Sequence, residues 1–358
     1  MVKKSLLLGL FICLTAAIAS AGPITAPPPG QLYHGVFPGG VNRNEDIIEP
    51  ADLISYQQTA GKKTAWVYFS HNWFRDRAFP AATAGWIRDN GSLPFIRLML
   101  RSSEELNTAE AVFTLDRINH GDFDADLKAW ARSAKEFKTP ILAEYGTEVN
   151  GRWFAWNGSW NGSAEAGPEK FKRAYRRIIQ IARDEQADNL LWVFHVNYND
   201  DPDEAWNRLE NYYPGGAWID WVGVSVYGAQ KPSGEANAGF RELMDAVYPR
   251  LVKLAPGKPI AVLEFGVTSL DKKIDQAGWA NRALKDLTGR RWPRVIGFAW
   301  WNEAWHNGGD PGFDTNMRIQ DNPALAKVFK QRVGANKKVL GSALKSEIYS
   351  NDRPPKSP

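Results

Sequence analysis

Cysteine is almost absent from this sequence, which contains one, Cys13, in 358 residues. A chain with a single cysteine forms no internal disulfide and no cysteine-based metal site, so its stability must come from an ordinary packed core. Histidine is also scarce: the five residues show neither HxxxH nor HExxH spacing, which argues against a catalytic metal. We therefore expect no metal and no cofactor.

The sequence also has no large excess of positive or negative charge. Lys and Arg together number 44 and Asp and Glu 40, and they are spread without blocks. Such a balance gives no electrostatic reason to expect binding to nucleic acid or to an anionic membrane. Beyond the first 21 residues, no apolar run is long enough to span a bilayer. We expect a monomer that acts on a neutral partner.

The one long apolar run lies at residues 1–21. Two lysines precede the segment LLLGLFICLTAAIA, and small residues follow it at positions 19–21, which is the order of a secretory signal peptide. The alternative is a lipoprotein anchor through Cys13. It is weakened because Ile12 is a poor residue before a lipidated cysteine and because Cys13 lies inside the apolar core. We predict that the protein is secreted or periplasmic.

Residues 22–333 alternate between apolar runs of strand length and segments with helical spacing of apolar residues. The predicted strands lie at 32–40, 64–70, 93–100, 141–146, 189–197, 218–228, 260–266 and 294–302. Helices are predicted at 45–61, 81–88, 123–137, 168–185, 238–254, 275–287 and 323–333. Eight such units predict a (β/α)8 barrel of one domain. The alternative is an open doubly wound sheet. It is disfavoured because this sequence has no glycine-rich phosphate-binding motif after the first predicted strand. The polar segment 334–358 is expected to be a loosely held extension.

Glutamates stand at the carboxyl ends of the fourth and seventh predicted strands. Glu148 follows PILAEYG, and Glu264 ends PIAVLE. These strands face each other across a parallel barrel, whose active site is built at the carboxyl ends of its strands. Retaining cleavage of a glycosidic bond needs an acid and a carboxylate nucleophile roughly 5–5.5 Å apart. Because Trp153 and Trp156 should raise the pKa of Glu148 and hydrogen bonds should keep Glu264 charged, we predict Glu148 as acid/base and Glu264 as nucleophile.

Aromatic and amide side chains in loop-like segments are candidates to contact a sugar. Tryptophan is abundant, with 16 residues, and its flat face stacks on sugar rings. Tyr227, at the end of the sixth strand, is either a residue that keeps one glutamate ionised or a rim residue without a chemical role. Glu303 is the one rival to the predicted carboxylate pair. The other candidates are Trp73, Trp153, Trp156, Trp160, Trp305, Asn150, Asn197 and Asn302, together with His195, for which a place in the core is the alternative.

Glu144 is predicted to lie one layer below Glu148, inside the barrel, if the fourth strand continues to Glu148. Arg97 occupies the same height on the third strand, so we predict a buried Arg97–Glu144 ion pair. Arg97→Met is then expected to destabilise the fold by roughly 3–5 kcal/mol. Adding Glu144→Leu should recover much of that loss.

Two segments resemble glycoside hydrolase family 26: GTEVNGRWFAWNG at 146–158 and VLEFG at 262–266. The resemblance implies a retaining (β/α)8 endo-glycosidase in which Glu148 is the acid/base and Glu264 the nucleophile. It also implies that Tyr227 lies beside the nucleophile and that Trp300 or Trp301 lines the cleavage subsite.

The sequence departs from the pattern of the mannan-cleaving members at Thr147 and Glu144, where those members have a histidine and a basic residue. Among neutral polysaccharides, β-1,4-mannan remains the first choice of substrate. Mixed-linked β-glucan is the principal alternative and β-1,3-xylan a further one. Two other classes are an inactive carbohydrate-binding barrel and a periplasmic solute-binding protein, although the sequence shows no two comparable lobes.

Two sites match the N-glycosylation pattern, Asn157-Gly-Ser and Asn161-Gly-Ser. Such tripeptides also arise often by chance, so the pattern alone does not predict that either asparagine carries a glycan.

Overall fold

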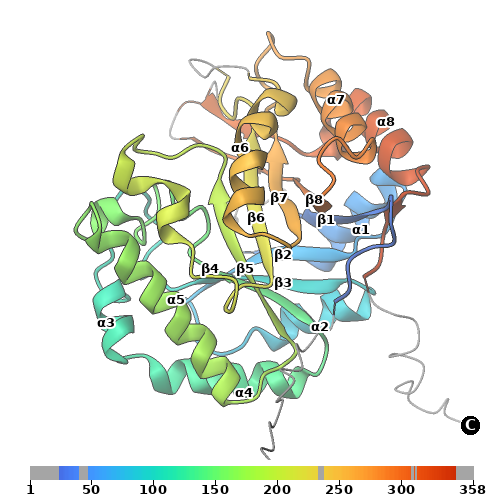
Figure 1. Cartoon of the computed structure of the whole chain (residues 1–358). Helices are drawn as coiled ribbons and strands as arrows, with labels where there is room; N and C mark the ends of the chain where they lie inside the picture. Colours follow the sequence, from blue (N-terminus) through green and yellow to red (C-terminus); the bar gives the residue numbers. More distant parts are fainter. Residues whose placement is uncertain (1–23, 40–46, 233–237, 308–309, 311–312, 344–358) are drawn as a thin grey trace, which may run out of the picture.

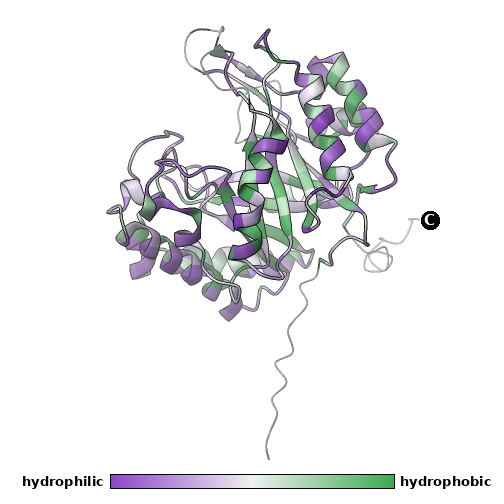
Figure 2. Ribbon diagram, turned by 45° about the horizontal axis from the view of Figure 1, so that its top comes forward, coloured by the Kyte–Doolittle hydropathy of each residue, from purple (hydrophilic) through white to green (hydrophobic). Residues whose placement is uncertain are grey.

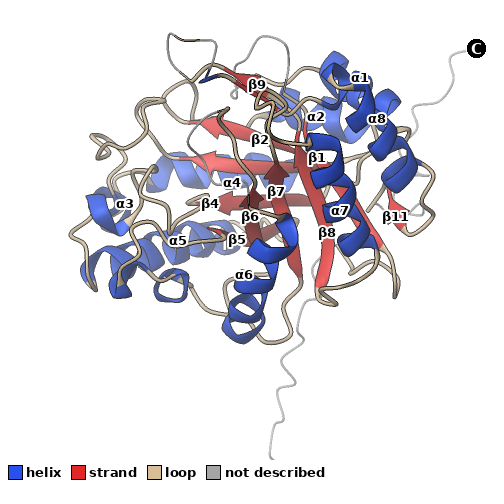
Figure 3. Cartoon of the chain, turned by 90° about the horizontal axis from the view of Figure 1, so that it is seen from above, coloured by secondary structure: helices blue, strands red, loops and turns tan. Residues whose placement is uncertain are grey.

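The protein folds as a closed barrel of eight parallel strands surrounded by helices (Figures 1 and 3). The computed structural model describes residues 24–39, 47–232, 238–307, 310 and 313–343, so the predicted signal peptide lies outside the described residues. Each strand pairs with the next in sequence, and the last pairs with the first. This confirms the predicted (β/α)8 barrel. The strands are β1 Leu32–Phe37, β2 Trp66–Asn72, β3 Leu93–Met99, β4 Ile141–Tyr145, β5 Leu190–Asn197, β6 Trp221–Tyr227, β7 Ile260–Gly266 and β8 Val295–Trp301.

The helices lie outside the barrel and bury one face each against it. In the longest helix, α5, buried residues recur three or four positions apart, as at Phe171, Ala174 and Ile178. Figure 2 shows hydrophobic strands in the middle of the molecule and hydrophilic residues along the helices. Within the described ranges, no helix has both the length and the apolar character needed to cross a membrane. The helices are α1 Pro50–Ala60, α2 Ala81–Asp89, α3 Leu115–His120, α4 Asp124–Phe137, α5 Ala166–Asp184, α6 Phe240–Leu254, α7 Gln276–Thr288 and α8 Pro323–Phe329.

A tryptophan fills the amino end of the barrel. Trp66 of β2 is fully buried, and its indole occupies the space that a Cβ would need at Gly35 of β1 or at Gly297 of β8. Trp221 of β6 meets the Trp66 ring edge to face, with centroids 6.1 Å apart. This end of the barrel is therefore packed, which leaves the carboxyl ends of the strands for a site.

The segment after α8 contradicts the prediction of an extension that begins at residue 334. Its short strand β11, Val339–Leu340, pairs in parallel with β1, and the backbone N–H of Leu32 donates to the carbonyl of Lys338 at 2.8 Å. β2 pairs with β1 only from Gly35 onward. On that side, the first residues of β1 pair with β11 instead. Residues 344–358, the rest of the predicted extension, lie outside the described residues.

Candidate active site

Glu148 lies in a tight turn just after β4. The strand ends at Tyr145, and Gly146 and Glu148 have positive φ angles of 77° and 47°. The expectation that the strand continues to Glu148 is therefore wrong. A Cβ at Gly146 would lie 2.2 Å from the Phe171 ring, so this turn requires glycine. The left-handed conformation of Glu148 is unfavourable for a non-glycine residue, and such strain is typical of functional positions.

The segment that follows Glu148 folds back beside it. The Trp153 indole N–H donates to Glu148 Oε2 at 2.7 Å, which orients the carboxylate. The Trp156 indole N–H donates to the carbonyl of Thr147 at 2.8 Å, and its ring stacks on Phe154 with centroids 4.6 Å apart. Trp156 is 3% exposed. The structure thus places Trp153 at the carboxylate and corrects the expected sugar-binding role of Trp156, which supports the turn from beneath.

Asn150 also supports this turn and does not face a substrate. Its side-chain amide donates to the carbonyls of Asn197 and Asn199 and to the carboxylate of Asp200, at 2.9–3.0 Å. The backbone N–H of Asn197 returns a hydrogen bond to Asn150 Oδ1 at 2.7 Å. Because Asn150 is fully buried, its expected contact with substrate is wrong; it fastens the loop after β4 to the loop after β5.

Glu264 lies at the end of β7 and is 4% exposed. The Tyr227 hydroxyl donates to its Oε2 at 2.9 Å. Burial raises the pKa of Glu264 to about 7; the charge of Arg97 opposes this rise, and the charge of Glu148 adds to it. The expected charge state is therefore corrected: one hydrogen bond from Tyr227 does not hold the carboxyl well below its usual pKa, because burial outweighs it.

A buried polar layer lies inside the barrel beneath these carboxylates. Arg97 Nε is 3.9 Å from Glu144 Oε1, with side-chain exposures of 3% and 0%. The nearer contacts of Glu144 come from Tyr68 and Thr147, whose hydroxyls donate to it, and from His195 Nδ1, which is 3.1 Å from Oε2. Glu144 and Arg97 thus form an ion pair within a larger network rather than an isolated pair.

The guanidinium of Arg97 is fixed by its own contacts. Its Nε donates to the Thr147 hydroxyl at 3.3 Å and its Nη1 to the Ser70 hydroxyl at 3.0 Å. It also lies 5.2 Å from the Trp301 ring centroid and 5.6 Å from that of Tyr68. Thr147 therefore bridges the cation and Glu144, accepting from one and donating to the other.

Of the two tryptophans that end β8, Trp301 faces this site. Its ring stacks on Phe37 of β1, with centroids 3.9 Å apart, and its N–H donates to Glu303 Oε2 at 3.0 Å. Trp300 points outward, donates to the carbonyl of Met317 at 2.7 Å and packs against Phe329 of α8. The expectation that Trp300 lines the subsite is wrong, because successive strand residues point to opposite faces. Glu303, the rival carboxylate, orients Trp301.

The remaining candidates occupy supporting positions. Of the two places predicted for His195, in the cleft or in the core, the structure gives the core, because the side chain is fully buried. Asn302 is fully buried and accepts from the backbone N–H of Ile319 at 2.8 Å. Trp73 is 2% exposed and packs on Phe113. Sequence analysis missed Tyr68 and Ser225, although period-two spacing from the buried Trp66 places Tyr68 inside the barrel one layer higher.

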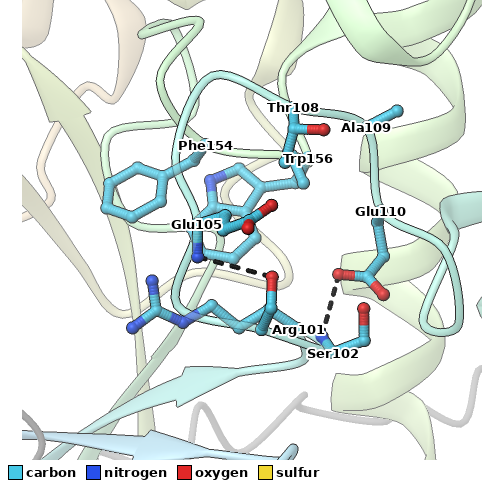
Figure 4. Close-up of a pocket in the computed structure, with 10 residues that line it drawn as sticks. Arg101, Ser102, Glu105, Thr108, Ala109, Glu110, Phe154 and Trp156 are labelled. Carbon is cyan, nitrogen blue, oxygen red and sulfur yellow. Dashed lines mark hydrogen bonds between the residues drawn. The ribbon is translucent and has the colours of Figure 1, made fainter.

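A small pocket lies beside the aromatic loop, between residues 101–110 and residues 154–156 (Figure 4). Phe154 and Trp156 form one wall, and the loop after β3 forms the other. The carboxylate of Glu110 accepts backbone N–H groups of Ser102, Val112 and Phe113 at 2.8–3.0 Å. These bonds shape the loop, so the acidic group is part of the loop's internal structure.

The geometry is therefore that of two interacting carboxylates at the mouth of a parallel barrel, with aromatic rings beside them. Among the residues that the structure describes, no three His, Cys, Asp or Glu side chains form a group able to hold a metal ion. The family model described as glycosyl hydrolase family 26 matches residues 103–266, a range that contains both glutamates. Residues 103–266 of this chain are therefore similar to glycosyl hydrolase family 26.

Relatives of this chain carry different names. "Endoglucanase H" of Acetivibrio thermocellus is 25% identical over 338 residues, covering 93% of this chain and 34% of that protein. "Mannan endo-1,4-beta-mannosidase" of Bacillus subtilis is 27% identical over 169 residues, covering 46% of this chain and 40% of that protein. "Beta-1,3-xylanase TXYA" of a Vibrio species is 28% identical over 117 residues, covering 32% of this chain and 23% of that protein. This chain thus spans well under half the length of these relatives.

Solved structures of family 26 share the fold. A β-mannanase from Bacteroides ovatus superposes with a TM-score of 0.63 at 15% identity, covering 90% of this chain and 94% of that one. A Bacillus subtilis mannanase superposes with a TM-score of 0.59 at 20% identity, covering 91% and 90%. At these identities the similarity establishes the barrel and no more.

Proposed function

We propose that this protein is a retaining endo-β-glycosidase that cleaves a neutral β-linked polysaccharide, with Glu148 and Glu264 as its catalytic pair. The observation that carries this proposal is the placement of two nearly buried carboxyl groups at the carboxyl ends of facing barrel strands, Glu148 just after β4 and Glu264 near the end of β7. Burial raises the pKa of Glu264 to about 7, and the charge of Glu148 adds to this rise. Retaining hydrolysis needs one carboxylic acid and one carboxylate at such a site.

In the proposed reaction, Glu148 protonates the leaving oxygen while Glu264 attacks the anomeric carbon and forms a glycosyl ester. Glu148 then takes a proton from the water that hydrolyses this ester, so both carboxyls return to their starting states. Trp153 holds Glu148 in position through its hydrogen bond, and Tyr227 does the same for Glu264. Trp301 is 5% exposed and is held between Phe37 and Arg97, so it lines the base of the site below the carboxylates.

For the backbone of the substrate we propose β-glucan in preference to the β-mannan expected first from sequence. The side chain that precedes the acid/base, Thr147, is 1% exposed, and its hydroxyl is occupied by Glu144 and Arg97. It therefore offers no polar group to the sugar beside Glu148, where the mannan-cleaving pattern has a histidine. The relative named endoglucanase also matches 93% of this chain, twice the share matched by the mannosidase.

The catalytic assignment is tested by Glu148→Gln and Glu264→Gln, with Glu303→Gln as the matched control. Glu303 is a buried carboxylate near the same mouth, and glutamine there can still accept the Trp301 N–H. We expect each of the first two changes to lower kcat by roughly 10³-fold or more, and Glu303→Gln to have a much smaller effect. Full activity of either glutamine variant at 148 or 264 would refute the assignment.

The class of protein and the substrate are tested by digesting barley β-glucan, β-1,4-mannan and β-1,3-xylan and sizing the products. We expect short oligosaccharides from β-glucan, with the anomeric configuration retained in the first product seen by proton NMR. Preferential release from mannan would overturn the proposed backbone but keep the reaction. Retardation in an affinity gel without release of reducing ends would instead show a binding barrel without catalysis.

A further inference from the structure

The buried layer below the carboxylates contains a histidine that the reaction itself does not use. His195 is fully buried in β5, and its ring contacts side chains from three other strands. Nδ1 lies 3.1 Å from Glu144 Oε2 and 3.1 Å from the Tyr68 hydroxyl, and Nε2 lies 2.8 Å from the Ser225 hydroxyl. Ser225 pairs in register with Glu264 on β7, so the ring is joined through Ser225 to the strand position beside the proposed nucleophile.

The contacts fix one proton on the ring. The Tyr68 hydroxyl donates its only hydrogen to Glu144, so it can only accept from His195. Glu144 likewise can only accept, because His195, Arg97 and Thr147 together lower its pKa against the effect of burial, so it carries no proton. Nδ1 therefore carries a hydrogen.

The other nitrogen has a partner that suits either charge state. A serine hydroxyl can donate to a neutral Nε2 or accept from a protonated one. Ser225 at 2.8 Å thus keeps the ring satisfied in both states. What decides the charge of His195 is the balance of the groups around it.

These groups are few and their charges can be counted. The side chains that act most strongly on Glu264 are Arg97, Glu144, Glu148 and His195. Tyr68 and Tyr227, which also face this layer, stay neutral because burial raises their pKa well above the ordinary value. When Glu148 and Glu264 are one carboxylic acid and one carboxylate, as the proposed reaction requires, a neutral His195 leaves one net negative charge in the layer, whereas a protonated His195 leaves none. A buried net charge is strongly unfavourable.

We propose that His195 is a positioning residue whose protonated ring balances the buried charge beneath Glu264 and thereby sets the acidic limit of activity. The proposal rests on the function proposed above. Burial acts to lower the pKa of His195, but the carboxylates of Glu144, Glu264 and Glu148 outweigh it and raise the pKa above its ordinary value. The geometry and the charge count therefore agree with the electrostatics.

The first test is the pH dependence of kcat/KM. In His195→Gln the ring's positive charge is lost, the pKa of Glu264 rises, and the nucleophile becomes protonated at a higher pH. We expect the acidic limb to move upward by about one pH unit, which is a tenfold loss of rate on that limb. Glu144→Gln combined with His195→Gln removes one charge of each sign, so the limb should move back toward that of the wild type.

His34→Gln is the matched control. His34 is also fully buried, its Nε2 lies 2.8 Å from the Tyr56 hydroxyl, and burial lowers its pKa to about 3, so it is neutral. Its replacement removes a buried ring without removing a charge, and the acidic limb should stay in place. The proposal would be overturned if the acidic limb of the pH profile stayed in place in folded His195→Gln. It would also be overturned if the limb of the Glu144→Gln/His195→Gln variant did not move back toward that of the wild type.

A second measurement does not depend on activity. In the uniformly ¹⁵N-labelled wild-type protein, long-range ¹H–¹⁵N spectra report the protonation of each imidazole, and the His195 signals are those missing from His195→Gln. We expect both ring nitrogens of His195 to be protonated at pH 6. A neutral ring at that pH would sink the proposal even if the enzyme is active, whereas a wild-type protein that cleaves no β-glycan would refute only the proposed function.

Discussion

Arg97→Met, alone and together with Glu144→Leu, tests how the buried layer is held together. If Arg97 and Glu144 stabilised each other alone, removing both would recover most of the loss caused by removing one. The structure predicts a different outcome, because Glu144 has three donors apart from Arg97: Tyr68, Thr147 and His195.

The magnitudes follow from these contacts. Arg97→Met removes two hydrogen bonds from a charged donor, to Ser70 and Thr147, at roughly 1.5 kcal/mol each, so we expect a loss of about 3 kcal/mol. Glu144→Leu leaves three buried donors without an acceptor, at roughly 1 kcal/mol or more each, so we expect at least about 3 kcal/mol. Solvent screening is negligible here, because both side chains are almost fully buried.

Urea unfolding monitored by tryptophan fluorescence measures the four free energies of a double-mutant cycle. We expect the double variant to lose roughly 4–5 kcal/mol, more than either single variant but less than the sum of the two losses, because the two side chains share Thr147. This replaces the recovery that the sequence alone led us to expect. A double variant as stable as either single one would refute the reasoning, since the ion pair would then outweigh the rest of the network.

Three further predictions concern the fold around the site. Gly146→Ala should lower the free energy of unfolding by at least about 2 kcal/mol and lower kcat, because the φ of 77° and the Phe171 ring exclude a Cβ. In the same unfolding assay, Gly85→Ala in α2, where space is open, should be neutral or slightly stabilising. Burial holds the pKa of His34 at about 3 and that of His71 at about 4, so below about pH 6.5 only the unfolded chain takes up their protons. Urea midpoints should therefore fall between about pH 6.5 and pH 4, and less steeply in His71→Asn; an unchanged slope in that variant would count against the assignment to His71. Asn157 is fully buried and its amide donates to the Val149 carbonyl, so glycopeptide mass spectrometry of folded protein from a glycosylating host should find Asn157 unmodified; a glycan there would contradict this packing.

The barrel could be predicted because its strands are buried on both faces and its helices on one, which leaves a clear pattern in the sequence. The two strand-end glutamates could be found for the same reason. The turn at Glu148 could not, because its direction depends on two left-handed residues, and only Gly146 gave a sign of it. The alternation of side chains along a strand implies that Trp300 and Trp301 face opposite ways. Which of them points inward becomes visible only in the structure, where Trp301 pairs with Phe37 on β1.

The partners of Glu144 were the least predictable part. Arg97 was found because it is a cation at the same height on the neighbouring strand. Tyr68, His195 and Thr147 come from two further strands and the turn, and their convergence depends on the relative heights of all the strands around the barrel. The relative heights of the strands are set by packing, so the sequence of any single strand does not reveal them.

The pairing of β11 with β1 affects the order in which this chain can complete its fold during synthesis. Leu32 is among the first residues of the barrel to leave the ribosome, yet its strand pairs with Val339 and, through Tyr33, with Gly297. Contacts between residues so far apart in sequence form late, because a long loop must be closed before they stabilise anything. The first residues of this strand therefore wait for nearly the whole chain, although Gly35 and Val36 can pair with β2 earlier. Until then its exposed edge is a place where a nascent molecule can pair wrongly.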